Sequence, residues 1–140
     1  MATHMKETAQ AKKKSTSEQL RERKILLFQE RIAHYEKTIA ELEQSRDALA
    51  ATDVTGLKVS HKTFGKGTVT EQSSMTITVR FDFGEKRFIM PSAFTEGYLS
   101  TENTEIREKL SRYPVIEGEI KRAKEDMHIA SRAVQNLLKQ

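Results

Sequence analysis

The stretch HKTFGKGTVTEQSSMTITVRFD, residues 61–82, decides the fold class of this chain. From Met75 to Asp82, apolar residues alternate with polar ones, which is the period of a strand with one buried face. Glycine and serine clusters on both sides of this run mark corners. We therefore expect short strands in a small antiparallel β-barrel, at residues 57–61, 67–72, 75–82 and 86–91.

The glycines at the start of this stretch are interpreted as a tight corner, where a positive φ is useful. A phosphate-binding P-loop requires a glycine, four residues and then Gly-Lys-Ser/Thr, and Gly65-Lys66-Gly67-Thr68 lacks that first glycine. Asp82-Phe83-Gly84 spells a kinase motif, but the chain lacks the companion motifs. Because no serine or carboxylate pair has a suggestive partner in the sequence, we expect no enzymatic activity and no cofactor.

Heptad spacing on both sides of the strands predicts two long helices. The first helix is predicted over residues 17–52, with Ser17 as its cap, and carries a seam that is interrupted by the charge of Arg46. The members of this seam are Ile25, Phe28, Ile32, Tyr35, Ile39, Leu42, Arg46 and Leu49. The second helical segment, within residues 100–140, has a seam of Ile116, Ile120, Ala123, Met127, Ala130, Val134 and Leu137. Pro114 lacks an amide, so we expect a break or kink there.

These elements predict an α+β fold with the barrel, residues 56–99, inserted between two helices that pair as an antiparallel coiled coil. In the expected register Ile32 faces Ala130 and Ile39 faces Ala123, so that large residues meet small ones. The competing hypothesis is that the first helix pairs with that of a second chain, as a homodimer. Residues 1–16, with lysines at 12–14, are predicted to be a disordered basic tail.

The composition restricts the remaining classes of function. The chain has 140 residues and no cysteine, so a disulfide framework and a thiolate metal site are excluded. The four histidines are isolated, and no metal site is expected. No apolar run is long enough to span a membrane, so we expect a cytoplasmic protein with no membrane partner. Residues 56–92 carry six basic and three acidic side chains, which favours an acidic partner.

The candidate binding residues are the basic and aromatic side chains of the predicted barrel: His61, Lys62, Phe64, Lys66, Arg80, Phe83, Lys86 and Arg87. Such a face can contact nucleic-acid backbone and bases or an acidic protein surface. The alternative is ordinary solvated charge, with the phenylalanines filling the ends of the barrel. For Phe64 this filling role is the favoured interpretation.

The residues of this segment also resemble a known module, the C-terminal Tudor-like domain of the PcrA/UvrD-type bacterial DNA helicases. The resemblance covers residues 56–92 and rests on Gly56, Val59, His61, Phe64-Gly65, Gly67, Val69, Val79-Arg80-Phe81 and Lys86-Arg87-Phe88. A looser likeness exists to the RNA-polymerase-interacting domains of the CarD and Mfd families. In the helicases this module contacts RNA polymerase, and nucleic-acid contacts are also proposed for it. The resemblance therefore implies a five-stranded barrel with an interaction role, whose candidate surface is the corner 61–66 and the hairpin 80–87. The helicase motor is absent, so ATPase and unwinding activities are not implied.

We therefore expect a non-catalytic bacterial adaptor that binds a transcription or DNA-repair protein such as RNA polymerase. Two alternatives stay open: a nucleic-acid-binding protein that uses the basic tail and the barrel face, and a protein whose coiled coil dimerises.

Overall fold

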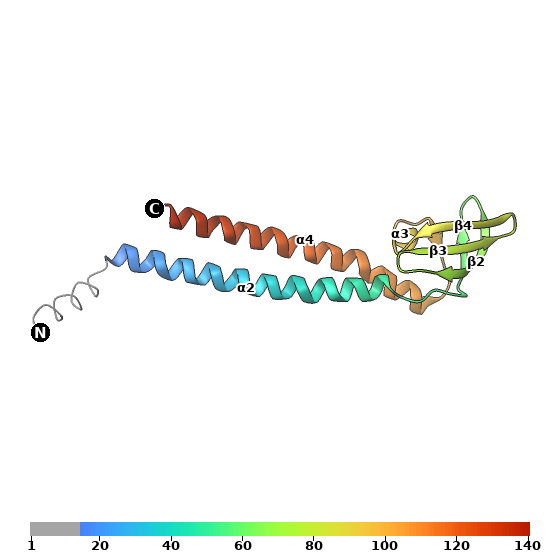
Figure 1. Cartoon of the computed structure of the whole chain (residues 1–140), viewed down its shortest axis with the longest axis horizontal. Helices are drawn as coiled ribbons and strands as arrows, with labels where there is room; N and C mark the ends of the chain where they lie inside the picture. Colours follow the sequence, from blue (N-terminus) through green and yellow to red (C-terminus); the bar gives the residue numbers. More distant parts are fainter. Residues whose placement is uncertain (1–14) are drawn as a thin grey trace, which may run out of the picture. The chain divides into compact units, whose positions relative to one another are not determined.

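The computed structural model describes residues 15–140 and has an α+β fold (Figure 1). The predicted basic tail lies outside the described residues, except for Ser15 and Thr16. The elements in chain order are α2 Thr16–Ala50, β1 Lys58–His61, β2 Gly65–Gln72, β3 Thr76–Phe81, β4 Gly84–Ile89, α3 Ser92–Thr95, β5 Leu99–Ser100 and α4 Thr104–Leu138. The described chain forms two compact units: residues 39–122, and residues 15–38 with 123–140.

The strands form one antiparallel sheet in the order β4-β3-β2-β1-β5. The four strands expected from the sequence are all present, with bounds that differ by up to two residues, and β5 is a fifth. Because β4 and β5 are the two edges and do not pair, the sheet is a curled half-barrel, so the expected barrel is present only as this curled, open sheet. Helix α3 contacts both of these edge strands.

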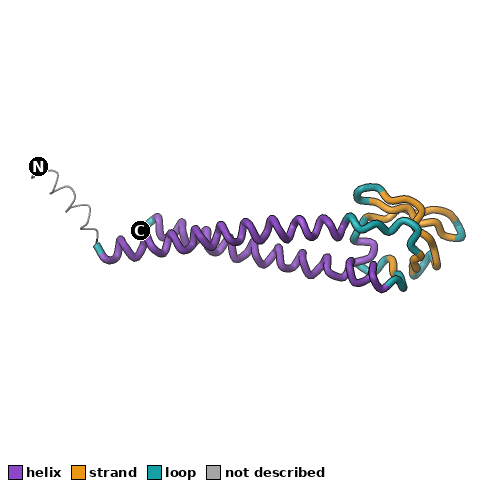
Figure 2. The backbone as a smooth tube through the Cα atoms, turned by 90° about the horizontal axis from the view of Figure 1, so that it is seen from below, coloured by secondary structure: helices purple, strands orange, loops and turns teal. Residues whose placement is uncertain are grey.

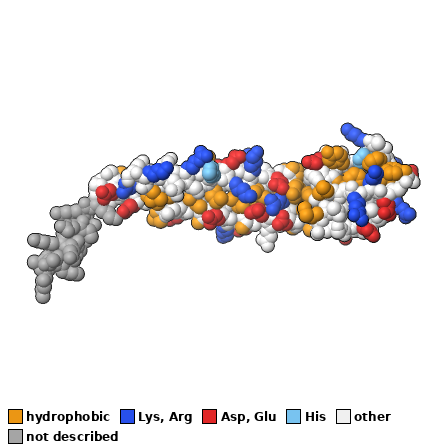
Figure 3. All heavy atoms as spheres, turned by 45° about the horizontal axis from the view of Figure 1, so that its top comes forward, with side chains coloured by type: hydrophobic (Ala, Val, Ile, Leu, Met, Phe, Trp, Pro, Cys, Tyr) orange, Lys and Arg blue, Asp and Glu red, His pale blue; other side chains and the backbone are white. Residues whose placement is uncertain are grey.

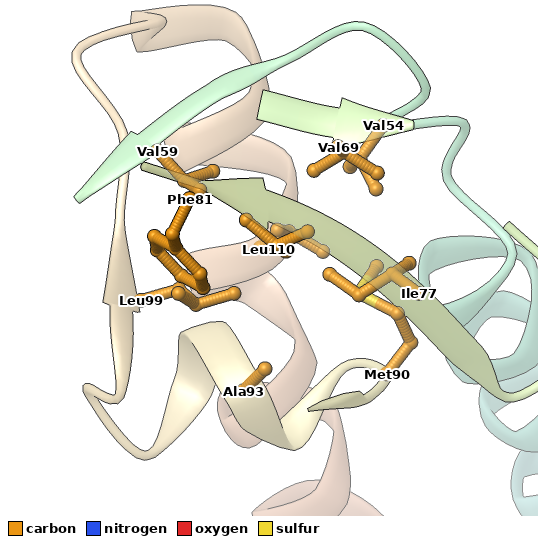
Figure 4. Packing of buried hydrophobic residues seen from close by; sticks show 10 residues of the cluster. Val54, Val59, Val69, Ile77, Phe81, Met90, Ala93, Leu99 and Leu110 are labelled. Atoms are coloured by element: carbon orange, nitrogen blue, oxygen red, sulfur yellow. The ribbon is translucent and has the colours of Figure 1, made fainter. Parts of the chain in front are cut away.

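The core of this unit lies on the inner face of the curled sheet (Figure 4). Alternate strand residues supply most of it, as the period of two predicted. Helix α4 adds Leu110, α3 adds Ala93 and the segment before β1 adds Val54. The buried residues of this core cluster are Val54, Val59, Val69, Ile77, Val79, Phe81, Met90, Ala93, Leu99 and Leu110. A five-stranded sheet of this size is small for independent stability, and these helical contacts enlarge its buried apolar surface.

In the other unit, residues 15–38 of α2 and residues 123–138 of α4 lie side by side and run in opposite directions (Figure 2). The Nη1 group of Arg21 donates a hydrogen bond to the backbone oxygen of Gln140, at 2.7 Å. This hydrogen bond joins the N-terminal part of α2 to the residues that follow α4. Helix α2 is capped by Ser15 and not by Ser17, since the Ser15 hydroxyl accepts a hydrogen bond from the Glu18 amide at 3.2 Å.

The predicted seams are the sheltered stripes of both helices. Every seam residue of α2 is buried or half-buried, whereas Leu20, Leu26 and Leu27 off the seam are more than half exposed. On α4, Ala130 and Val134 are buried. The heptad spacing therefore identified the sheltered face of each helix.

Helix α4 continues through Pro114 without the break that was one of the two expectations for this proline. A proline inside a helix removes one hydrogen bond and costs about 3 kcal/mol. Here the turns on both sides are held by burial, since Leu110 precedes Pro114 and Ile120 follows it, and each is 3% exposed. Tertiary packing therefore outweighs the local cost of Pro114.

Candidate binding surface

The corner between β1 and β2 is organised by the side chain of His61. Its Nδ1 atom accepts hydrogen bonds from the backbone amides of Thr63 at 3.0 Å and Phe64 at 3.2 Å. Because Nδ1 is an acceptor in both bonds, the imidazole carries its proton on Nε2. The pairing of β1 with β2 ends at His61 and Gly65. The histidine therefore fixes the turn that presents Lys62 and Phe64.

The two glycines of this corner serve different physical needs. Gly65 has a φ of +79°, a conformation that residues with a Cβ rarely adopt. Gly67 faces the core, where an added Cβ would lie 2.7 Å from the Phe81 ring and 2.9 Å from the Arg80 carbonyl oxygen. The sequence expectation of a positive φ therefore holds for Gly65, whereas Gly67 is required by close packing.

Five rings gather at the end of the sheet where this corner meets the turn between β3 and β4. We call this group the aromatic end; it consists of His61, Phe64, Phe81, Phe83 and Phe88. The rings of His61 and Phe64 stack with centroids 4.3 Å apart. Phe64 packs half-buried against the core, in keeping with the filling role expected for it.

Phe83 is the exposed member of the aromatic end. Its side chain is 58% exposed, yet its ring stacks on the buried Phe81 with an interplanar angle of 2°, and its centroid lies 5.1 Å from that of Phe64. The Nζ atom of Lys86 lies 5.4 Å from the Phe64 centroid, within the range of a cation–π contact. The aromatic end is thus an ordered apolar surface with a cation beside it.

Lys66 and Arg80 lie elsewhere, on the outer face of the sheet. They line an open groove of about 720 Å³ together with residues from β1, β5 and the start of α4. Four cations line it, which we call the groove cations: Lys58, Lys66, Arg80 and Arg107. Two carboxylates, Asp82 and Glu102, also line it. Serine and threonine hydroxyls complete the lining at Ser60, Thr68, Ser100 and Thr101.

The eight predicted residues therefore fall into separate places. His61, Phe64, Phe83 and Lys86 meet at the aromatic end, whereas Lys66 and Arg80 lie in the groove. Lys62 is exposed at the β1–β2 corner. Arg87 is exposed opposite Thr78 and borders a separate hollow with Thr55 and Glu71. In the region of the sheet, Figure 3 shows basic side chains exposed beside hydrophobic ones.

Lys58 and Arg107 are groove residues that the sequence prediction missed. Strand alternation places Lys58 on the same outer face as Lys66, so the period of β1 was a usable signal. Arg107 belongs to α4, and only the tertiary fold brings it to the sheet. No pattern in the sequence indicated that juxtaposition.

Chemically, the surface offers cations, hydroxyls and the exposed ring of Phe83. Within residues 15–140, no cluster of three His, Cys, Asp or Glu residues could hold a metal ion. In the same range, neither long helix has an apolar stretch that would cross a membrane. Comparison with known protein families, curated proteins and solved structures finds no match.

Proposed function

We propose that this chain is a non-catalytic adaptor that binds the acidic surface of a protein partner through its aromatic end. The observation that carries the proposal is Phe83. A phenylalanine that is 58% exposed leaves a large apolar area in water. Removal of that area from water by a partner is favourable by about 25 cal/mol per Å². Aromatic side chains of this kind are enriched at protein interfaces.

The order of this surface also supports a binding role. Stacking on Phe81 and contact with Phe64 restrict the Phe83 ring before any partner arrives, so little side-chain entropy remains to be lost on binding. The neighbouring Lys86 and Lys62 are exposed and favour a partner patch that carries carboxylates.

RNA polymerase, or another protein of transcription or DNA repair, is the proposed partner because of the resemblance of residues 56–92 to the helicase Tudor-like domain. The test is retention of purified bacterial RNA polymerase on the immobilised chain. We compare wild type with Phe83→Ala/Lys86→Glu and with the matched control Val115→Ala/Lys121→Glu, which changes an equally exposed apolar residue and an exposed lysine on α4.

Wild type and control should retain the polymerase, and the aromatic-end variant should lose it. No retention by wild type would refute RNA polymerase as the partner. Equal retention by all three chains would refute the aromatic end as the site.

A further inference from the structure

We infer a second binding site, distinct from the aromatic end: the outer-face groove takes the phosphodiester backbone of a single-stranded nucleic acid. The first observation is the pairing state of the groove cations. Among residues 15–140, the charged end of each of the four makes neither an ion pair nor a side-chain hydrogen bond with another described residue. Four free cations oppose two carboxylates in one hollow, so an anionic ligand is electrostatically favoured.

The second observation is the spacing that the strand register imposes. Lys58 lies opposite Thr68, which in turn lies opposite Arg80, in one row across three strands. Lys66 lies opposite Ser60 in the next row. Lys66 is therefore the diagonal neighbour of both Lys58 and Arg80, at about 7–8 Å from each at the backbone. The three cations form a zigzag across the sheet.

Hydroxyl groups occupy the positions between these cations. Ser60 and Thr68 alternate with the lysines on the outer face of β1 and β2, and Ser100 pairs with Ser60 from β5. Hydroxyls donate hydrogen bonds to phosphate oxygens. A row of cations with hydroxyls between them suits a ligand with several linked phosphates better than a ligand with one anionic group.

A single strand fits this surface better than a duplex does. Two strand spacings separate Lys58 from Arg80, which is about 10 Å, and Arg107 and Glu102 border the hollow. A flexible strand can bend into such a short hollow, whereas a stiff duplex would have to be deformed. Binding should be governed by backbone charge and should show little sequence preference.

The test measures the fluorescence anisotropy of a labelled oligothymidylate at several salt concentrations with the full chain. We compare wild type with Lys66→Gln/Arg80→Gln and with the control Lys109→Gln/Lys121→Gln, which removes the same charge from exposed positions of α4. Loss of two phosphate contacts should weaken binding. It should also make the slope of log binding constant against log salt concentration less steep by about 1.4. The control should keep the wild-type slope, and a duplex of the same sequence should bind more weakly.

Lys58→Gln/Arg107→Gln is a second groove variant, and circular dichroism checks that both variants keep their fold. A variant with lysines 12–14 changed to glutamine separates any contribution of the N-terminal basic residues. The inference is overturned if wild type does not bind at low salt, if the control loses as much affinity as the groove variants, if only the variant at 12–14 loses binding, or if the duplex binds more tightly. RNA polymerase retention is measured separately, so either proposal can fail alone.

Discussion

The Gln72 side chain fixes the buried Val54 to the sheet: its Oε1 atom accepts a hydrogen bond from the Val54 amide at 2.8 Å. The Nε2 group of the same side chain donates to the Thr52 carbonyl at 2.9 Å. One carboxamide on β2 therefore satisfies one amide and one carbonyl of the segment that leads from α2 to β1. Val54 is 1% exposed, so water does not readily replace these bonds.

Gln72→Ala should reduce the free energy of unfolding by about 1–3 kcal/mol, because a buried amide loses its acceptor. Chemical denaturation measures this loss, and hydrogen exchange of the Val54 amide should accelerate. Gln44→Ala is the control, since Gln44 is exposed on α2 and its truncation should change stability by less than about 0.5 kcal/mol. Equal effects at both positions would contradict the role of Gln72.

The two corner glycines should respond differently to asparagine. Asparagine tolerates a positive φ better than other residues with a side chain, so Gly65→Asn should be milder than Gly65→Ala, which should cost about 1–2 kcal/mol. Gly67→Ala should cost about 1–3 kcal/mol through overpacking, and Gly67→Asn should cost more. Thermal denaturation of the four variants measures these differences. A Gly67→Asn variant as stable as Gly65→Asn would show that the contact with Phe81 is not limiting.

Local patterns in the sequence predict single strands and helices but not the contacts between them. Alternation from Met75 to Asp82 gave the inner and outer faces of β3, and the heptad spacing gave the sheltered helix stripes. The two-residue strand β5 was not located, because a run so short has no period. The path of α4 through Pro114 depends on burial of Leu110 and Ile120, which are tertiary contacts.

Residues 32 and 130 belong to the same compact unit and are predicted to face each other. Ile32→Cys/Ala130→Cys should form an intramolecular disulfide on oxidation, and the native chain contains no cysteine that would compete. Ala33→Cys/Ala130→Cys is the control, because Ala33 is exposed beside the seam. Mass spectrometry and non-reducing electrophoresis identify the products. Disulfides only between chains would instead favour the homodimer.

Asp53 should titrate below the ordinary range of an aspartate. The Thr55 backbone amide donates to its Oδ1 atom at 3.0 Å, and this hydrogen bond, followed by one from the Thr55 side chain, lowers the pKa of Asp53. A carboxyl group whose pKa is lower in the folded state stabilises the fold above its unfolded pKa of about 3.9, and the contribution is lost as the pH falls through the folded pKa.

The pKa of Asp53 can be measured by NMR titration of its side-chain carbon. In Thr55→Val, which lacks the hydroxyl, the Asp53 pKa should rise partway toward the ordinary value. A midpoint for wild type at or above about 3.9 would contradict the assigned hydrogen bonds.

The candidate site was predictable in its residue types but not in its arrangement. Basic and aromatic side chains of residues 61–87 were identified, yet the sheet divides them between the aromatic end and the outer-face groove. Alternation along one strand predicts such a division, since Lys66 and Gly67 point to opposite faces. The contact of Phe83 with Phe64, and the presence of Arg107 and Lys66 in one groove, depend on which strands and helices become neighbours.

Photocrosslinking from position 83 tests whether the aromatic end contacts a protein partner. Benzoylphenylalanine at position 83 should crosslink to RNA polymerase, and the same residue at position 115 should not, although Phe83 and Val115 are 58% and 60% exposed. The proposal predicts a strong crosslink from position 83 alone. No crosslink from position 83, or equal yields from both positions, would contradict it.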